Sequence, residues 1–498
     1  MNPHLLCERA IDLLLDGQLQ ESEQLFLQLV EVEGVNFTAR HLLGVIRMQQ
    51  GRNEEALEWI GAALQVNPQS PAALSNYGNA LMALGQAEPA LASYDKALAL
   101  DPDFAEALYN RGTILADLKR PEEALASYDK ALALEPDHVQ ALEGRGNILS
   151  DLGRADEALA SYDRALALRP DFIAAHYSRG NLLSQLKRLD EALAGYDKAL
   201  ALRPDFIEAG YRRGSVLCEL NRVAEGLAVY RHFAELALAP DAGGLEEPAY
   251  KVRHDAEQRE YLGIDAARSL PFHLAGGERL ATRAVNPDDG RNIGEQWRTS
   301  RPQLVVIDDL LSPEALDGLR RFCWGSTIWR KIYENGYLGA TPESGFACPL
   351  LAQIADEMRL AYPEIFRAHP LRYLWGFKYD SSLSGINLHA DFAAVNVNFW
   401  ITPDEANLDP DSGGLVVWDA PAPLDWDFEK YNKDVTAARD FLARSGAKKI
   451  TVPYRANRAV IFDSDLFHET DQIRFKDGYQ NRRINVTLLY GDRGAGDI

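Results

Sequence analysis

Two histidines and one aspartate in the second half of the chain have the residue types of a metal site. His389 and Asp391 lie two positions apart, and His468 follows much later. If residues 386–391 form a strand, the side chains of His389 and Asp391 emerge on one face, whereas Ala390 points away. Two imidazoles and one carboxylate occupy one face of an octahedral ferrous ion and leave three positions open. We therefore expect His389, Asp391 and His468 to bind iron(II).

These residues fall in a region with the pattern of an antiparallel β-sheet. Short apolar or alternating runs are separated by Gly, Asp and Pro, which is typical of strands joined by turns. The predicted strands are Tyr373–Tyr379, Ile386–Asp391, Val395–Thr402, Leu415–Asp419, Lys449–Val452, Ala459–Phe462 and Ile484–Tyr490. His468 is expected on a further strand, after a turn. The domain is predicted to begin near residue 302, where a strand pattern precedes a helix capped by Ser312.

This region resembles the iron(II)- and 2-oxoglutarate-dependent dioxygenases over about residues 302–492. His389-Ala390-Asp391 matches the H-x-D motif of that family, and His468 matches its distal histidine. The resemblance implies a double-stranded β-helix (jelly roll) with flanking helices, similar to that of prolyl hydroxylases. It also implies Fe(II), 2-oxoglutarate as co-substrate, and O2. Halogenating relatives replace the carboxylate with a small residue, so Asp391 favours hydroxylation.

The resemblance further suggests which residues bind 2-oxoglutarate. An arginine about 10–15 positions after the distal histidine normally pairs with the far carboxylate, a contact that suits the planar guanidinium. Arg483 is the expected residue, and Arg482 is the alternative, because a shift of one position reverses the facing. Tyr379 has the spacing of a co-substrate-binding tyrosine, or else it is an ordinary sheet residue. Asn398, which is alternatively a surface residue, and Asn485 are further candidates.

Residues 420–447 form a long segment between two predicted strands, with a predicted helix at Lys433–Arg444. Long loops in compact domains often act as lids. This segment either covers a substrate, docks against the repeat array, or is a packed decoration.

The first half of the chain repeats with a period of 34 residues. Each unit contains two stretches with helical periodicity, such as Ala73–Leu84 and Ala87–Leu100. The ladders with this period are Tyr94, Tyr128, Tyr162, Tyr196 and Tyr230; Gly44, Gly78, Gly112, Gly146, Gly180 and Gly214; and Pro68, Pro102, Pro136, Pro170 and Pro204. They resemble the tetratricopeptide repeat over about residues 5–236, which implies about seven helix pairs stacked into a solenoid with a groove.

A row of arginines shares the same period and has two interpretations. Its members are Arg111, Arg145, Arg179 and Arg213. Their guanidinium groups either line the groove and hold an acidic peptide, or pair within the array with Asp95, Asp129, Asp163 and Asp197. Asn76, Asn79, Asn110, Asn147 and Asn181 are likewise candidates for peptide contacts or for local hydrogen bonds.

Composition limits the classes of partner. The formal charge of −22 disfavours general binding to nucleic acid or to anionic membranes. The four cysteines are scattered without a framework spacing, which fits a reducing compartment. No run of about 18 apolar residues occurs, and the N-terminus lacks the basic start of a signal peptide. We therefore expect a cytoplasmic protein.

The sequence predicts three segments: a tetratricopeptide solenoid at 1–236, a connector at 237–301 and a dioxygenase domain at 302–498. The first hypothesis is a hydroxylase for a side chain of a protein or peptide held in the repeat groove, because tethering raises local substrate concentration. A second is an oxygenase for a small molecule or natural-product intermediate, with repeats used for assembly. A third is a non-catalytic peptide-binding scaffold. A homodimer through the repeats is compatible with each.

Overall fold

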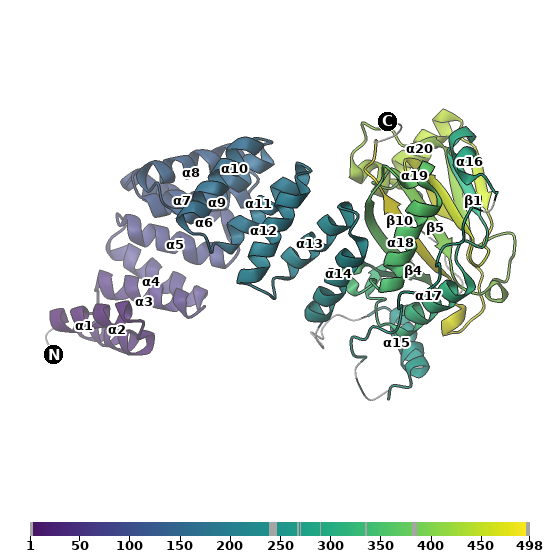
Figure 1. Cartoon of the computed structure of the whole chain (residues 1–498). Coiled ribbons are helices and arrows are strands. Elements are labelled where there is room, and N and C mark those ends of the chain that lie inside the picture. Colours follow the sequence, from purple (N-terminus) through teal and green to yellow (C-terminus); the bar gives the residue numbers. More distant parts are fainter. Residues whose placement is uncertain are drawn as a thin grey trace. The chain divides into compact units, whose positions relative to one another are not determined.

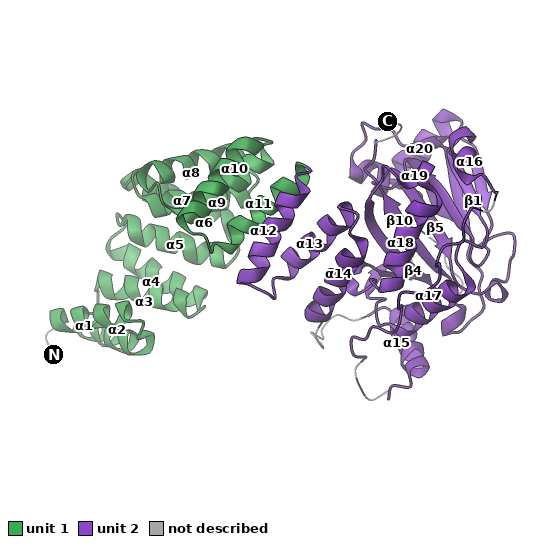
Figure 2. Cartoon of the chain, viewed as in Figure 1, with its two compact units in different colours: residues 1–186 green, residues 187–498 purple. Residues whose placement is uncertain are grey.

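The computed structural model describes residues 3–238, 247–265, 268, 270–288, 290–333, 336–380 and 386–494. The chain divides into two compact units, residues 1–186 and 187–498 (Figures 1 and 2). The described part of the first unit consists of helices and their connections, whereas the second combines helices with β-sheets. No helix within the described ranges has both the length and the apolarity needed to cross a membrane.

The first unit is a series of antiparallel helix pairs joined by short turns. Its helices are α1 (Pro3–Leu15), α2 (Leu19–Glu33), α3 (Phe37–Gln49), α4 (Asn53–Val66), α5 (Pro71–Ala83), α6 (Ala87–Leu100), α7 (Ala105–Asp117), α8 (Pro121–Leu134), α9 (Val139–Asp151), α10 (Ala155–Leu168) and α11 (Ile173–Gln185). Within the pair α5–α6 the tyrosine and glycine ladders meet. A Cβ atom on Gly78 would lie 2.7 Å from the Tyr94 ring, so this close approach requires glycine.

The arginine row pairs within the array, as one of its two interpretations predicted. Each guanidinium Nε lies 2.6–2.7 Å from the carboxylate 16 positions earlier: Arg111 with Asp95, Arg145 with Asp129, Arg179 with Asp163, and Arg213 with Asp197. Local hydrogen bonds also engage the asparagines. Asn79 accepts from the hydroxyl of Tyr94 at 2.6 Å, and Asn147 accepts from that of Tyr162 at 2.7 Å.

The second unit begins with the helices α12 (Leu189–Leu202), α13 (Ile207–Glu219) and α14 (Val223–Ala237). α14 packs on the later helix α18, and α13 contacts strand β4. Val223, Leu227 and Tyr230 of α14 are buried in the same hydrophobic cluster as residues of the β-rich region. The division into compact units therefore falls between residues 186 and 187, earlier than the predicted boundary at 236/237.

The β-rich part of the second unit contains two antiparallel sheets. The larger has the strand order β1-β8-β5-β10-β4-β3-β2, and the smaller has the order β7-β6-β9. The strands are β1 (Leu304–Ile307), β2 (Lys331–Tyr333), β3 (Tyr337–Ala340), β4 (Leu371–Tyr379), β5 (Val395–Trp400), β6 (Leu415–Pro421), β7 (Lys449–Val452), β8 (Ala459–Asp463), β9 (Leu466–Thr470) and β10 (Ile484–Tyr490). Tyr379, Trp400 and Phe462 from the larger sheet share a buried cluster with Leu415 and Val417 from the smaller.

Helices cover the outside of these sheets (Figure 1). They are α15 (Ala249–Leu262), α16 (Ile293–Thr299), α17 (Pro313–Gly325), α18 (Pro349–Ala361), α19 (Pro363–Phe366) and α20 (Val435–Ser445). Short turns of 3-10 helix lie at Pro342–Ser344, Asp404–Ala406 and Tyr479–Asn481, and a π-helical turn lies at Glu429–Lys433. The serine cap predicted at Ser312 is confirmed, because its side chain accepts from the backbone N–H of Ala315.

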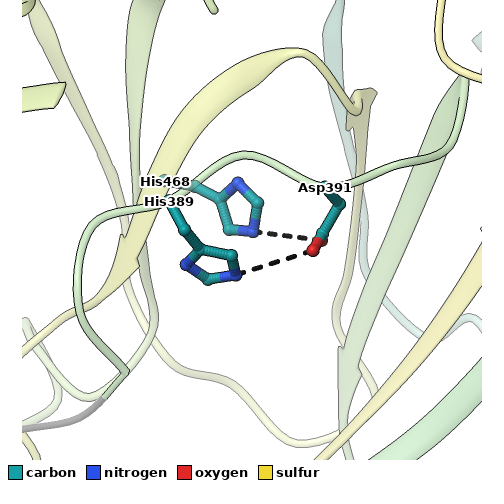
Figure 3. Close-up of side chains that lie close together, drawn as sticks. All are labelled: His389, Asp391 and His468. Atoms are coloured by element: carbon teal, nitrogen blue, oxygen red, sulfur yellow. Dashed lines mark ion pairs between the residues drawn. The ribbon is translucent and has the colours of Figure 1, made fainter. Parts of the chain in front are cut away.

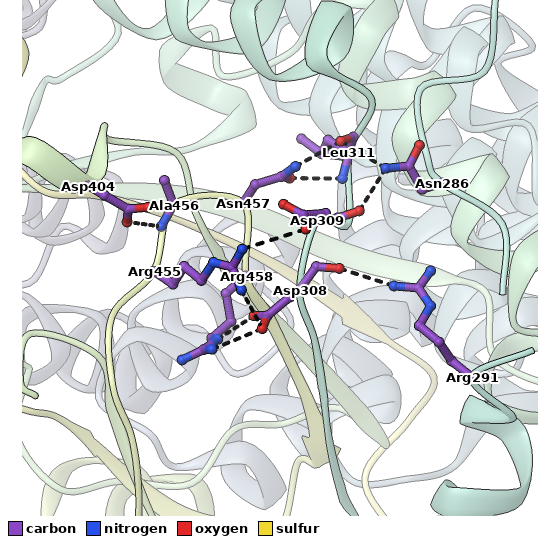
Figure 4. Close-up of polar contacts among 10 residues, drawn as sticks. All are labelled: Asn286, Arg291, Asp308, Asp309, Leu311, Asp404, Arg455, Ala456, Asn457 and Arg458. Carbon is purple, nitrogen blue, oxygen red and sulfur yellow. Dashed lines mark hydrogen bonds and ion pairs between the residues drawn. The ribbon is translucent and has the colours of Figure 1, made fainter. Parts of the chain in front are cut away.

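A polar network fixes the edge strand β1 to the loop that precedes β8 (Figure 4). Arg458 makes a two-pronged contact with Asp308, at 2.5 and 3.0 Å, and Arg455 adds a third contact at 2.8 Å. The hydrogen bond from Arg458 and the neighbouring positive charges lower the pKa of Asp308. Asn457 both accepts from and donates to the backbone of Leu311. The network sets the position at which β8 starts.

The predicted strand at residues 386–391 was wrong in its extent. Only His389 forms a bridge, with His468 of β9, through the hydrogen bonds His389 N to His468 O (3.0 Å) and His468 N to His389 O (2.8 Å). The amide of Ala390, which points away from β9 in this antiparallel pair, donates to Tyr431 O at 3.0 Å. The ladder ends because Asp391 N, the next amide that faces β9, donates to Ser464 O in the turn between β8 and β9.

Candidate metal centre

His389, Asp391 and His468 converge on one point (Figure 3). Each offers a ligand atom, and these atoms all lie within 4.8 Å of one another. His389 Nε2 is 3.7 Å from Asp391 Oδ1, and His468 Nε2 is 3.4 Å from Asp391 Oδ2. No other group of three such residues was found within the described ranges. The arrangement has the ligand types and spacing to hold one metal ion on a single face.

The backbone fixes which nitrogen of each imidazole faces the site. His389 Nδ1 lies 2.8 Å from Asn387 O, and His468 Nδ1 lies 3.0 Å from Leu466 O. A carbonyl oxygen only accepts, so each Nδ1 carries the proton and each Nε2 presents its lone pair. Such contacts orient histidine ligands in metal sites. Both imidazoles are therefore set to coordinate through Nε2.

Electrostatics keep the site in its metal-binding form at neutral pH. Burial, followed by the nearby His468, lowers the pKa of His389 to about 4. Burial alone would raise the pKa of Asp391, but its contacts with His468, His389 and Asn396 lower it overall. A neutral imidazole and an ionised carboxylate are what a metal ion requires.

A chain of buried side-chain amides is hydrogen-bonded to the carboxylate of Asp391. Asn396 Nδ2 donates to Asp391 Oδ2 at 2.5 Å, and Asn398 Nδ2 donates to Asn396 Oδ1 at 2.6 Å. Asn485 Nδ2 donates in turn to Asn398 Oδ1 at 2.7 Å, and Thr487 also donates to that oxygen. The structure thus brings the predicted residues Asn398 and Asn485 to the site. Asn396, two positions before Asn398 on β5, contacts the carboxylate directly.

The structure separates the two arginine candidates. Arg483 is buried and lines the same cavity as the triad, and it donates to the carbonyl oxygens of Gly413 and Gly414 at 2.6 and 3.1 Å. Arg482 points elsewhere, where it pairs with Glu257 at 3.0 Å and Asp380 at 2.9 Å. The fallback assignment of Arg482 is therefore not supported by its position, because its guanidinium is already occupied outside the cavity.

The ring of Tyr379 packs against the guanidinium of Arg483. Its ring centroid is 4.8 Å from the guanidinium carbon, and its hydroxyl is 3.5 Å from Thr470 Oγ1. Tyr337 stacks on its other side with centroids 5.3 Å apart. Tyr379 does not line the inner cavity, so the position supports a packing role for its ring. Trp375 and Phe377, which sequence reasoning missed, do line it.

Two connected cavities meet at the triad. The inner one holds Arg483, Asn398, Asn485 and the three candidate ligands, and it has only about 20 Å³ of free space. The outer one has about 620 Å³ and opens beside His389 and Asp391. Trp375, Phe377 and Ile386 line both cavities. Any ligand larger than a water molecule must therefore displace side chains to enter the inner cavity.

The segment 420–447 is hydrogen-bonded to the loop of residues 386–391, which carries two of the candidate ligands. Ala390 N donates to Tyr431 O at 3.0 Å, and Asn432 Nδ2 donates to Ala390 O at 2.8 Å. Leu388, Ala390 and Phe467, which neighbour the candidate ligands, are buried in one cluster with residues of this segment. The segment is therefore part of the site's framework and not a separate decoration.

Comparison with known proteins identifies the repeats. Models described as "TPR repeat" match residues 44–85, 78–119 and 146–187, and a model described as "Tetratricopeptide repeat" matches residues 105–138 and 173–206. The tetratricopeptide repeats are confirmed. The chain thus combines an all-α tetratricopeptide array with a C-terminal antiparallel β-rich region. No curated protein matches this chain.

Three of the solved structures similar to this chain are described as tetratricopeptide repeat (TPR) proteins. A thermophilic TPR protein of Thermus thermophilus is 30% identical, with 36% of this chain and 99% of that chain covered and a TM-score of 0.32. A tetratricopeptide repeat protein of Parabacteroides merdae is 23% identical, with coverage of 47% and 93% and a TM-score of 0.40. YrrB, described as a TPR protein with an unusual peptide-binding site, is 24% identical, with coverage of 37% and 95% and a TM-score of 0.33.

The pKa of His389 predicts how stability responds to acid. The unfolded histidine binds a proton near pH 6.5, whereas the folded one does so only near 4. Between these values the unfolded chain binds more protons, so the free energy of unfolding should fall as the pH is lowered from 6.5 to 4, by about 3 kcal/mol at most. Tryptophan fluorescence during urea unfolding of the metal-free chain measures this, since seven of eight tryptophans lie in the second unit. His389→Gln should flatten the slope, and equal slopes would contradict the assignment.

The contact between Asn432 and Ala390 predicts a local effect. Asn432→Ala removes one hydrogen bond from the loop of residues 386–391, which is worth about 1 kcal/mol. Amide hydrogen exchange in that loop should accelerate by roughly fivefold. Asn481→Ala, which removes a contact to Asp477 O in a surface turn, serves as the control and should leave the loop unchanged. Unaltered exchange in Asn432→Ala would show that the segment does not hold the loop.

Proposed function

We propose that this protein is an iron(II)- and 2-oxoglutarate-dependent dioxygenase that hydroxylates a side chain of a protein or peptide substrate. The observation that carries the proposal is the convergence of His389, Asp391 and His468 in the cavity that also contains Arg483. Two imidazoles and one carboxylate suit Fe(II) and leave coordination positions open for other ligands. The fixed orientation of both histidines supports the same assignment.

Arg483 supports a carboxylate co-substrate. Its Nη1 atom is buried and has no hydrogen-bond partner among the described residues. Burial lowers the pKa of Arg483, yet the guanidinium remains charged in proteins. The acceptors recorded for this guanidinium, two glycine carbonyls and the Tyr379 hydroxyl, are neutral. The buried charge therefore calls for an anion, and a carboxylate suits the guanidinium fork. The far carboxylate of 2-oxoglutarate fits this description, provided that the lining side chains open the small inner cavity.

The path of the chain supports a double-stranded β-helix. From β4 onward the chain passes to the His389 bridge on β9, returns to β5, crosses to β6 and β7, returns to β8, crosses to β9 and ends on β10. The larger sheet contributes β4, β10, β5 and β8 side by side. Repeated crossing between two sheets is the property that gives this fold its name. The candidate ligands all lie on the segments that belong to the smaller sheet or lead away from it.

In the proposed reaction the chain supplies binding and orientation. Iron and 2-oxoglutarate, when bound, would activate dioxygen for insertion into a C–H bond. His389, Asp391 and His468 would hold the metal, while Asn396 keeps the carboxylate in place. Arg483 would fix the far end of the co-substrate. Trp375, Phe377 and Ile386 would separate the inner site from water at the outer cavity.

The repeat array supports a polypeptide substrate. Tetratricopeptide arrays present extended surfaces for binding, and YrrB, a similar protein, is described as having a peptide-binding site. A second contact far from the reacting group raises the local substrate concentration. A protein or peptide partner is therefore the expected ligand of the repeats.

Succinate formation tests the proposal. The full-length chain, incubated with Fe(II), 2-oxoglutarate, O2 and cell extract, should form succinate and products heavier by one oxygen atom. His389→Ala and His468→Ala should abolish both, because two ligands hold the metal poorly. His232→Ala, which changes an exposed histidine of the same unit, is the matched control and should retain activity. Succinate formation that is equal in all four proteins, or absent from the unaltered chain, would contradict the proposal.

Arg483 and Arg482 make a matched pair for the co-substrate. Arg483→Gln should raise the KM for 2-oxoglutarate by roughly 10- to 100-fold, since a charge-assisted contact is lost. Arg482→Gln should leave that KM unchanged, because Arg482 pairs with Glu257 and Asp380. Circular dichroism verifies that each variant is folded. The opposite ranking would assign the co-substrate to Arg482.

A further inference from the structure

The outer cavity has an aromatic floor. Tyr373, Trp375 and Phe377 are alternate residues of β4 and therefore project from the same face. Their rings follow one another, with centroids 5.7 Å and 6.0 Å apart, and each is partly accessible to water. This floor leads directly to His389 and Asp391, which line the same cavity. An apolar group resting on it would lie next to the candidate metal centre.

Two different segments form the walls. One wall is the β2–β3 hairpin, which contributes Lys331, Tyr333 and Tyr337. Lys331 pairs with Gly339, and Gly339 pairs with Phe377, so Lys331 lies two strands from the floor in the same cross-strand row. The other wall belongs to the segment 420–447, from which Phe428 and Lys433 line the cavity. The side chain of Phe428 is 43% exposed, so the mouth presents apolar surface to water.

Two lysines contribute positive charge to the lining of this cavity. The charged groups among its described lining residues are Lys331, Lys433 and Asp391, and Asp391 is the candidate metal ligand. Lys433 pairs with the exposed Glu429 at 2.6 Å. Lys331 lies over the ring of Tyr333 at 5.2 Å and has no ion-pair partner in the described part of the chain. Lys331 is therefore an unpaired cation among the described lining residues, in a chain with a net charge of −22.

We propose that the outer cavity binds a polypeptide segment in which an apolar side chain, placed on the aromatic floor, is flanked by an acidic side chain that pairs with Lys331. The inference rests on the proposed function and specifies its substrate class. A volume of about 620 Å³ is in the range that holds a drug-sized ligand and so accommodates a short segment. Apolar contact with aromatic rings supplies affinity, and the lysines select the flanking charge.

End-capped hexapeptides test the proposal. They contain a central leucine flanked by glutamate, glutamine or lysine and are otherwise identical. Calorimetry with the full-length chain, Mn(II) and 2-oxoglutarate measures binding without turnover. At low ionic strength the glutamate peptide should bind roughly 3- to 10-fold more tightly than the glutamine peptide, and the lysine peptide should bind most weakly. The preference should shrink as salt is added.

Matched variants show whether Lys331 is the residue that selects the flanking charge of the peptide. Lys331→Glu should reverse the order of the three peptides, whereas Lys449→Glu, the same charge change at an exposed lysine of β7, should preserve it. Glu429→Gln should strengthen the preference for glutamate, because it releases Lys433. Equal affinity for the three peptides, an unchanged order in Lys331→Glu, or N-acetyl-leucine amide binding as tightly as the hexapeptides would overturn the proposal.

The result separates this inference from the proposed function. Charge-selective peptide binding without any succinate formation would retain the cavity's ligand class and reject the dioxygenase. Succinate formation on a substrate that shows no dependence on Lys331 would retain the dioxygenase and reject the acidic flank.

Discussion

The burial of one carboxylate, that of Asp391, constrains much of this structure. An ionised group away from water is tolerated only when partners surround it. Here the amide of Asn396 donates to it, and the Nε2 atoms of His389 and His468 lie 3.7 and 3.4 Å from its oxygens. Each is itself held: the imidazoles by backbone carbonyls, and Asn396 by a chain of amides that crosses to β10. Both Nε2 lone pairs therefore face the carboxylate, and a cation bound between the three groups would balance its negative charge.

Three separate parts of the fold maintain this arrangement. The larger sheet carries the amide chain, and the smaller sheet carries His468. The segment 420–447 holds Ala390 through both its N–H and its C=O groups. That same segment also supplies Phe428 and Lys433 to the outer cavity. A ligand in the outer cavity therefore contacts the element that positions the candidate metal ligands, which couples recognition to the geometry of the centre.

Much of this was predictable from the sequence. The period of 34 residues predicted the repeats, since stacked helix pairs must reuse the same packing positions, as Gly78 and Tyr94 do. The strands β7 and β10 have the predicted bounds, because their apolar runs are clearly bounded by turns. The three candidate ligands were found from residue type and spacing, and the structure brings them together.

Other features depend on tertiary contacts that leave no local pattern. The arginine row had two interpretations because its partners lie 16 positions away on another helix. Residues 386–391 have the alternation of a strand, but the Asp391 amide that would continue the ladder with β9 donates to Ser464 O instead. The facing of Arg482 and Arg483 is reversed by a shift of one residue, so only the paired register of β10 separates them. The apolar face of α14 resembles that of any repeat, although it packs on α18.

The central claim is that a metal and a carboxylate co-substrate share one site, and thermodynamic coupling between them tests it most directly. Anaerobic calorimetry of the full-length chain would measure Fe(II) affinity with and without 2-oxoglutarate. The account predicts one Fe(II) per chain and tighter binding of each ligand in the presence of the other, by the same factor in both directions. Fe(II) affinity that is unaffected by 2-oxoglutarate, or no Fe(II) bound at all, would contradict it.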